Sequence, residues 1–177
     1  MRSTVRLLAV AALALAAAGC GGAAAASGPS TSGTSVGNGG GKRETVKLHV
    51  VKGRKGATLA LAAVRIDGKG PFVFAIDTGA ARSLVARSVA KKLGLDLKGS
   101  HPVSGVACST KAASVHLAHW SVGGVTLPSR TVDSVSLPGQ SGKKLQGLIG
   151  SDVLSTYGAV QIDYQHQRLV LRARTQG

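Results

Sequence analysis

The segment 72–85 has the sequence Phe-Val-Phe-Ala-Ile-Asp-Thr-Gly-Ala-Ala-Arg-Ser-Leu-Val and carries a single acid, Asp77, out of an apolar run into a glycine turn. The run 72–76 is apolar throughout, which is typical of a buried strand. A charge beside such a strand is costly unless another group pairs with it or shares its proton. The chain has only 7 acidic residues against 22 basic ones. We therefore predict a chemical role for Asp77.

The N-terminal segment has the pattern of a secretory signal peptide. Arg2 and Arg6 precede an apolar stretch, 7–18, that is too short to span a bilayer comfortably. The sequence Leu-Ala-Ala-Ala-Gly-Cys at 15–20 resembles a bacterial lipoprotein lipobox. This resemblance implies a signal peptide over residues 1–19 and a lipid on Cys20, with ordinary cleavage nearby as the alternative. The expected location is the outer face of a bacterial cell membrane.

Residues 20–44 are predicted to be a linker. Between 21 and 41 the chain consists largely of Gly, Ala, Ser, Thr, Pro and Asn, so it cannot bury enough apolar surface to offset its ordering entropy. We expect a flexible tether that holds one folded domain, residues 45–174, just off the membrane surface.

The charge of the chain is strongly positive, +15 over all 177 residues. Residues 1–19 contain two arginines and no acid, so their removal leaves 20 basic and 7 acidic residues, a formal charge of +13. This charge predicts either a generally solvated basic surface or attraction to anionic lipid headgroups and acidic envelope polymers. Nucleic acid is not an expected partner, because few aromatic residues exist to stack bases and no nucleic-acid module is present.

The pattern after residue 44 predicts an all-β fold, mainly β with one or two short helices. The segment 86–93 is a predicted helix, with Gly94 as its stop. The segment 138–144 is a predicted loop, and 145–154 is a predicted strand that breaks into a short helix. Strands are predicted at 45–51, 58–66, 72–76, 101–107, 113–122, 125–127, 131–136, 159–164 and 168–172.

Two motifs together resemble the retropepsin-like aspartic proteases, and bacterial aspartyl protease-like lipoproteins in particular. The first is the apolar strand that ends in Asp-Thr-Gly-Ala at 77–80 and is followed by Ser83 and an aliphatic pair. The second is Gly-Leu-Ile-Gly-Ser-Asp-Val-Leu at 147–154, which is similar to the segment that supports the active-site loop in that family. The resemblance covers roughly residues 45–174. It implies the closed barrel of the acid-protease fold and an aspartic endopeptidase of the cell envelope.

The resemblance also implies roles for the residues of the first motif. Asp77 would be the catalytic carboxyl, which activates a water to attack a peptide bond, so no metal or cofactor is expected. Gly79 permits the tight turn, and Thr78 reaches across to its counterpart in such families. Ala80 completes the active-site loop, and Ser83 is expected to bond locally to the same loop as support.

The mechanism needs two aspartates, and Asp-Thr-Gly occurs only once in the chain. The resemblance therefore implies a homodimer in which two copies of Asp77 meet on the two-fold axis. Asp152 is expected to support structure or the interface. Ala81, Arg82 and Ser151 depart from the retroviral pattern, which favours an acidic substrate and a dimer that is held differently.

A flap that closes over the peptide substrate is expected between the two motifs. The candidate is the segment 101–108, with Ser104, Gly105 and Val106 as the residues closest to substrate, because small residues let an extended peptide pass close by.

Other residue types in the chain point to no second site. Cys108 has no His or Asp close in sequence to activate it as a nucleophile. His116 and His119 would point to opposite faces of a strand, which does not favour a zinc site. Trp120 is expected in the core or an interface. A second hypothesis remains open from the sequence: a non-catalytic module that uses the acid-protease fold to bind a peptide or an envelope polymer.

Overall fold

The computed structural model describes residues 42–52, 58–106, 108–137 and 145–175. Contacts within the chain define a compact unit over Gly40–Gly177. Among the described residues, the hydrophobic core cluster lies entirely between Val46 and Leu171. No helix among the described residues has the length and apolar character needed to cross a membrane.

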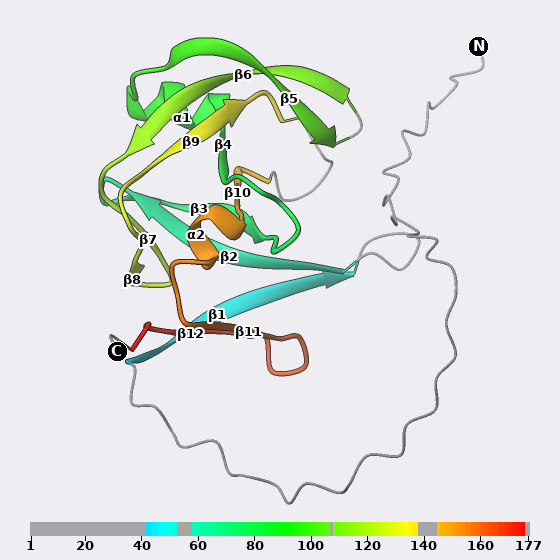
Figure 1. The fold of residues 1–177 in the computed structure, drawn as a ribbon, viewed down its shortest axis with the longest axis vertical. Coiled ribbons are helices and arrows are strands. Elements are labelled where there is room, and N and C mark those ends of the chain that lie inside the picture. Colours follow the sequence, from blue (N-terminus) through cyan, green and yellow to red (C-terminus); the bar gives the residue numbers. More distant parts are fainter. Residues whose placement is uncertain (1–41, 53–57, 107, 138–144, 176–177) are drawn as a thin grey trace, which may run out of the picture. The chain divides into compact units, whose positions relative to one another are not determined.

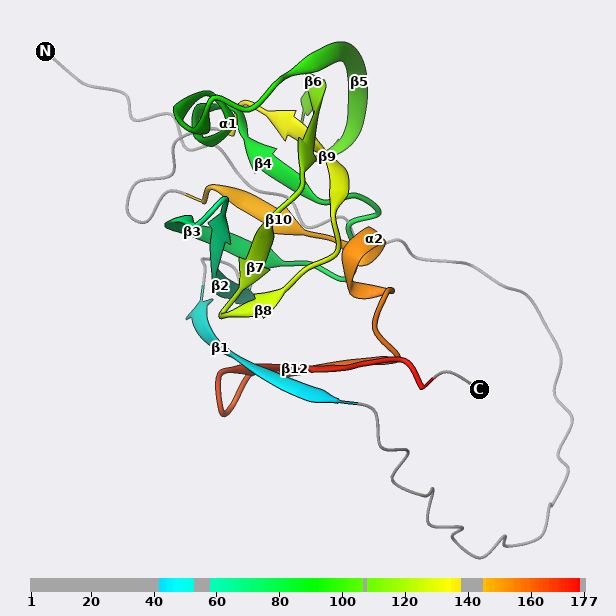
Figure 2. The same cartoon turned by 90° about the vertical axis from the view of Figure 1, so that its left-hand side faces the viewer.

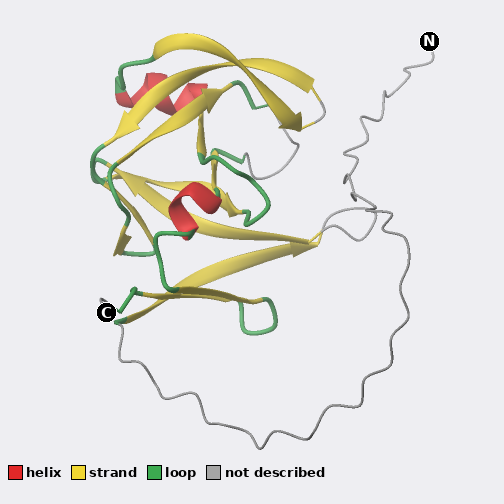
Figure 3. Ribbon diagram, viewed as in Figure 1, coloured by secondary structure: helices red, strands yellow, loops and turns green. Residues whose placement is uncertain are grey.

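Twelve strands and two short helices make up the described part of the domain (Figures 1 and 3). The strands are β1 (Arg43–Lys52), β2 (Thr58–Ile66), β3 (Lys69–Ile76), β4 (Leu84–Ala86), β5 (Lys98–Val106), β6 (Cys108–Leu117), β7 (Trp120–Val122), β8 (Val125–Thr126), β9 (Arg130–Val135), β10 (Gly147–Ile149), β11 (Ala159–Asp163) and β12 (Arg168–Arg172). The helices are α1 (Arg87–Leu93) and α2 (Ser151–Leu154). The predicted mainly-β class with two short helices is therefore confirmed.

All twelve strands belong to one sheet, with the order β11-β12-β1-β2-β3-β10-β4-β9-β6-β5, while β7 pairs with β2 and β8. Most pairs are antiparallel, but β10 is parallel to β3 and β4 is parallel to β9. Figures 1 and 2 show the β5–β6 hairpin and β9 at one end of the domain and β11, β12 and the start of β1 at the other. The strands β3, β10 and β4 lie between these two ends.

The expected closed barrel is wrong for the described residues, because β11 and β5 end the strand order and do not pair with each other. The reason lies in β1, which changes its partner half-way along. Residues 43–47 pair with β12, whereas residues 48–52 pair with β2. This exchange carries the C-terminal hairpin away from the rest of the sheet and leaves the sheet open.

Helix α1 ends where its residues predict. Its last turn carries Lys91 and Lys92, whose positive charges are stabilised by the negative, C-terminal end of the helix dipole. Gly94 then adopts the left-handed conformation with φ 70°, and its N–H bonds back to the carbonyls of Ala90 and Lys91. Val89 and Ala90 are buried and fix the helix to the core.

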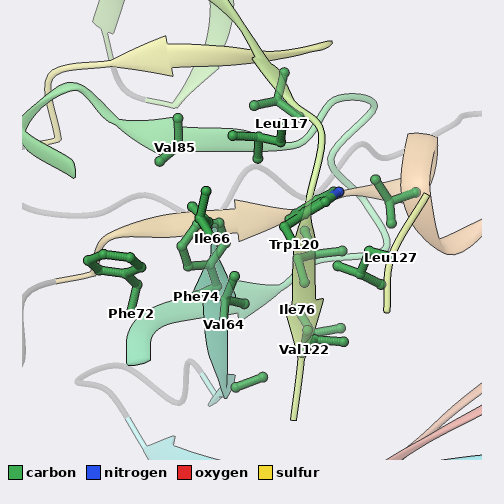
Figure 4. Packing of buried hydrophobic residues seen from close by; sticks show 14 of the residues in the cluster. Val64, Ile66, Phe72, Phe74, Ile76, Val85, Leu117, Trp120, Val122 and Leu127 are labelled. Atoms are coloured by element: carbon green, nitrogen blue, oxygen red, sulfur yellow. The ribbon is translucent and has the colours of Figure 1, made fainter. Parts of the chain in front are cut away.

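The core consists of aliphatic and aromatic side chains from both halves of the domain (Figure 4). Phe74 and Ile149, from the two parallel strands β3 and β10, are 0% and 1% exposed. Trp120 is buried as predicted, and its indole N–H donates to the carbonyl of Pro128 at 2.8 Å. The core therefore surrounds the pair of strands that ends at Asp77.

Two further strand predictions are corrected. The expected single strand 113–122 is instead the second half of β6 followed by β7, with residues 118 and 119 between them. The break lets β6 pair with β9 while β7 pairs with β2. Strand β4 was not predicted, because its three residues form a strand only through pairing with the distant β9 and β10.

Candidate active site

Asp77 lies where the parallel strands β3 and β10 end together. Ile76 is paired with Ile149, and the next N–H along the chain, that of Asp77, donates to the carbonyl of Ile149 at 3.0 Å. The chain then turns, with the N–H of Ala80 3.3 Å from the carbonyl oxygen of Asp77. A buried strand therefore fixes the backbone of Asp77, while its side chain is exposed.

The carboxyl group of Asp77 is oriented by its own turn. The backbone N–H of Gly79 donates to Asp77 Oδ1 at 2.9 Å, which fixes the orientation of the carboxyl group. A Cβ on residue 79 would lie only 3.3 Å from this oxygen, so glycine keeps the space clear. Thr78 is exposed and Ala80 is half-buried. One carboxyl oxygen is thus bonded to the chain, and the group faces solvent.

The second motif supports this turn from behind. Ser151 donates to the carbonyl of Ala80 through its N–H at 2.8 Å and through its hydroxyl at 3.0 Å. Gly150 lies so close that a Cβ there would be 2.8 Å from the carbonyl oxygen of Ala80 and from the carbonyl carbon of Arg82. Only a residue without a side chain fits between the two loops.

Ser83 joins the same two segments through a buried hydrogen-bond network. Its N–H and its hydroxyl donate to Asp152 Oδ1 at 2.9 and 2.7 Å. The hydroxyl oxygen also accepts from the N–H of Gly150 at 2.9 Å. The expected local bonds of Ser83 are therefore replaced by bonds to the second motif. Asp152 acts here as an acceptor that fixes Ser83.

The family model described as "Aspartyl protease" matches residues 62–153, a range that contains both motifs. The chain belongs to the aspartyl protease family.

Two solved structures are similar to this aspartyl protease family member. The retropepsin-like aspartic protease from Rickettsia conorii has 20% sequence identity and a TM-score of 0.49, over 75% of this chain and 91% of that one. The retroviral protease-like domain of Ddi1 from Leishmania major has 17% identity and a TM-score of 0.40, over 62% of this chain and 84% of that one. A comparison with curated proteins found no match.

The flap segment predicted for this family member falls in the hairpin of β5 and β6. Ser104, Gly105 and Val106 are the last residues of β5, and Val106 is paired with Cys108 of β6. Residue 107, between them, lies outside the described residues, as does the predicted lipidation site Cys20. The candidate flap residues therefore lie near the end of a long hairpin.

An ion-pair cluster around the buried Asp133, near the active-site loop, was not predicted from the sequence. Asp133 of β9 is 4% exposed and binds the Arg82 guanidinium with both oxygens, Nε to Oδ2 at 3.0 Å and Nη2 to Oδ1 at 3.2 Å. His101 Nε2 lies 3.1 Å from Asp133 Oδ1. The cluster connects the loop after Asp77 with β5. The sequence feature that could have predicted this cluster is the acid Asp133 within the predicted strand 131–136, because a buried acid needs a cation beside it.

The two histidines considered for a zinc site, His116 and His119, lie at the end of β6 and just after it. His116 is exposed on β6 and bonds Thr131 Oγ1 at 3.3 Å and Ser129 Oγ at 3.0 Å. His119 is exposed and follows the end of β6. Within the ranges that the structure describes, no three His, Cys, Asp or Glu residues are grouped closely enough to hold a metal ion.

Proposed function

We propose that this protein is an aspartic endopeptidase of the bacterial cell envelope, which hydrolyses peptide bonds as a homodimer with one Asp77 from each copy. The observation that carries the proposal is the Asp77 carboxyl itself. It is exposed at the end of a buried strand, and one of its oxygens is held by Gly79. This arrangement leaves the group free to meet a second carboxyl.

Five of the other six acids of the chain are bonded to neighbouring residues and the sixth lies in a hairpin turn, which supports a second copy as the source of that carboxyl. All seven acidic residues lie in the described ranges. Asp133 and Asp152 are bonded to Arg82 and Ser83. Asp163 binds His166 and Arg168, Glu44 is 2.6 Å from Lys42, Asp96 is 3.4 Å from Lys98, and Asp67 forms a hairpin turn with positive φ.

Two Asp77 carboxyls about 3 Å apart would not both ionise, as is typical of aspartic protease dyads, so they would share one proton. The ionised carboxylate takes a proton from a water bound between them, and that water attacks the peptide carbonyl. The protonated carboxyl donates its proton to the developing oxyanion, which gives a tetrahedral diol. The proton taken from the water then passes to the amide nitrogen, the other carboxylate takes a proton back from the diol, and the C–N bond breaks to release a carboxylic acid and an amine. In each copy the N–H of Gly79 would hold one oxygen of the Asp77 carboxyl in position.

The assembly around this dyad follows from the same loops. Thr78 is exposed beside Asp77 and would bond its counterpart in the second copy. The β5–β6 hairpin would close over an extended peptide and exclude water. The signal peptide over residues 1–19 and the lipid on Cys20 would place the dimer at the membrane, where tethering raises its local concentration.

The test compares the wild-type domain with Asp77→Asn on a mixed peptide library, over a range of protein concentrations and of pH from acid to neutral. Asp96→Asn is the matched control, because Asp96 is an exposed acid outside the active-site loop. We expect cleavage by the wild type and the control, none by Asp77→Asn, and a specific activity that rises with protein concentration.

Two results would oppose the proposal in different ways. A strict monomer that still cleaves would exclude the shared dyad. Peptide binding without cleavage at every pH, unchanged in Asp77→Asn, would identify the protein as a binding module on a protease fold.

A further inference from the structure

One face of the sheet formed by β1, β12 and β11 carries four cations. Along β1, Arg43, Thr45 and Lys47 are exposed, whereas Val46 and Leu48 are buried in the core. The register pairs Arg43 with Arg172 and Lys47 with Arg168. Since directly paired residues of an antiparallel sheet share a face, all four cations lie on the same side.

The pairing is unfavourable within the domain itself. Like charges that lie directly opposite each other destabilise a strand pair. Here both outward pairs between β1 and β12 that carry charge are cation against cation. An anion bound at this face would relieve the repulsion.

Compensation by acids on this face is slight. Asp163, paired with Arg168 across β11 and β12, is 13% exposed and is already bonded to the His166 ring at 2.9 Å and to Arg168 Nε at 3.0 Å. Every acid of the chain lies in the described ranges, and none of them forms an ion pair with Arg43, Lys47 or Arg172 there. Three of the four cations are free to bind an anion.

The surface is also hollowed where two of these cations lie. A hollow of about 480 Å³ is lined by Thr45, Lys47, His166, Gln167 and Arg168. Its cationic and hydrogen-bonding groups match the chemistry of a phosphate-bearing headgroup.

The place of this face on the chain favours a membrane as the partner. Arg43 is the first residue of β1, so the predicted linker from Cys20 joins the domain at this face. A flexible linker of that length spans about 25 Å on average. The domain has a radius of gyration of about 14 Å, so a tether of this length keeps the surface around its attachment point near the membrane.

We propose that the face formed by Arg43, Lys47, Arg168 and Arg172 docks the domain on anionic lipid headgroups. The inference rests on the membrane anchoring in the proposed function. A second copy of the chain is a poor partner for this face, because four cations would meet four cations. Figures 1 and 2 show β11, β12 and the start of β1, the strands that carry these residues, at the end of the domain away from the β5–β6 hairpin, so docking through them leaves that hairpin uncovered.

The test measures binding of the domain from residue 40 onward, without lipid, to neutral phosphatidylcholine vesicles and to vesicles that also contain phosphatidylglycerol. The variant Arg43→Gln, Lys47→Gln, Arg172→Gln removes the three cations without an acidic partner. The matched control, Lys69→Gln, Lys91→Gln, Lys111→Gln, removes the same charge from exposed residues on other elements. Single variants and circular dichroism separate loss of binding from loss of folding.

We expect the wild type to bind the anionic vesicles and not the neutral ones, with binding lost near 1 M salt, where the Debye length is about 3 Å. Each removed cation of the face should weaken binding about fivefold, and the triple variant about a hundredfold. The control should weaken it far less.

Three outcomes would overturn the proposal: no binding to anionic vesicles, equal weakening by the two triple variants, or tighter binding to soluble polyglutamate or polyphosphate than to vesicles. Vesicle binding is measured without a peptide substrate. Failure here with intact cleavage therefore refutes only the docking face, and failure of cleavage with intact docking refutes only the protease.

Discussion

Replacement of Ser83 by alanine should loosen the connection between the two active-site segments. The Ser83 hydroxyl is the single atom that bonds both Asp152 and the N–H of Gly150, and Ser83 is 1% exposed. Water therefore cannot take its place without a rearrangement. The substitution removes both bonds and adds no bulk.

The magnitude follows from two contributions. A hydrogen bond to a charged acceptor contributes about 1.5–3 kcal/mol, and a buried N–H without a partner costs about 1–3 kcal/mol. Asp152 keeps the bond from the backbone N–H of residue 83, so the carboxylate is not left without a donor. Because one atom makes both bonds, the two terms overlap. We expect a loss of about 2–4 kcal/mol in the free energy of unfolding.

Urea unfolding, followed by tryptophan fluorescence, measures this loss. Trp120 is the single tryptophan and is 2% exposed, so its emission reports the opening of the core. Ser88→Ala is the control, because Ser88 is exposed on α1 and its replacement should change stability by less than about 0.5 kcal/mol. The slope of free energy against urea should stay constant if only stability changes.

A double-mutant cycle with Asp152→Ala provides the decisive comparison. The coupling between the two substitutions should reach about 1–2 kcal/mol, because the residues are in direct contact. Additive effects, or a loss in Ser83→Ala no larger than in Ser88→Ala, would refute the reasoning that this network holds the two segments together.

Two other predictions concern the second glycine and the C-terminal hairpin. Gly150→Ala should lower the free energy of unfolding by about 1–3 kcal/mol or more, because the new Cβ would lie 2.8 Å from main-chain atoms of the active-site loop. The same substitution should abolish the proposed cleavage. Normal stability in urea together with normal cleavage would contradict this. The backbone N–H of His166, its ring and Arg168 lower the pKa of Asp163 to about 2. Because the usual unfolded value is about 3.9, the stability that this group contributes is complete above that pH and is lost as the pH falls toward 2. Asp163→Asn should remove this part of the acid sensitivity, and urea midpoints between pH 2 and 5 that fall equally in both proteins would contradict the assignment.

The parts of the fold that could be predicted from the sequence are those whose causes are local. Gly94 ends α1 through its left-handed conformation, and Asp67 with Gly68 turns β2 into β3 through positive φ angles. The run 72–76 is buried because its side chains are apolar, whichever strand lies beside it.

The parts that could not be predicted depend on partners far along the chain. Leu84 extends a strand only because Leu148 and Asp133 pair with it. The open sheet follows from the change of partner along β1, and the local sequence of β1 does not indicate that change. Asp133 lies in a strand that is predicted from the sequence, but its role in the ion-pair cluster depends on Arg82 and His101, which come from two other segments.

The parallel pairing of β3 with β10 also affects the order of events during synthesis. The N–H of Asp77 and the residues before it are paired with 147–149, a segment made long after Asp77 itself. Such non-local pairing forms late, because a long loop must close first. A chain that stops before residue 147 lacks the strand that fixes the backbone of Asp77. The backbone position of Asp77 is therefore fixed only after nearly the whole domain has been made.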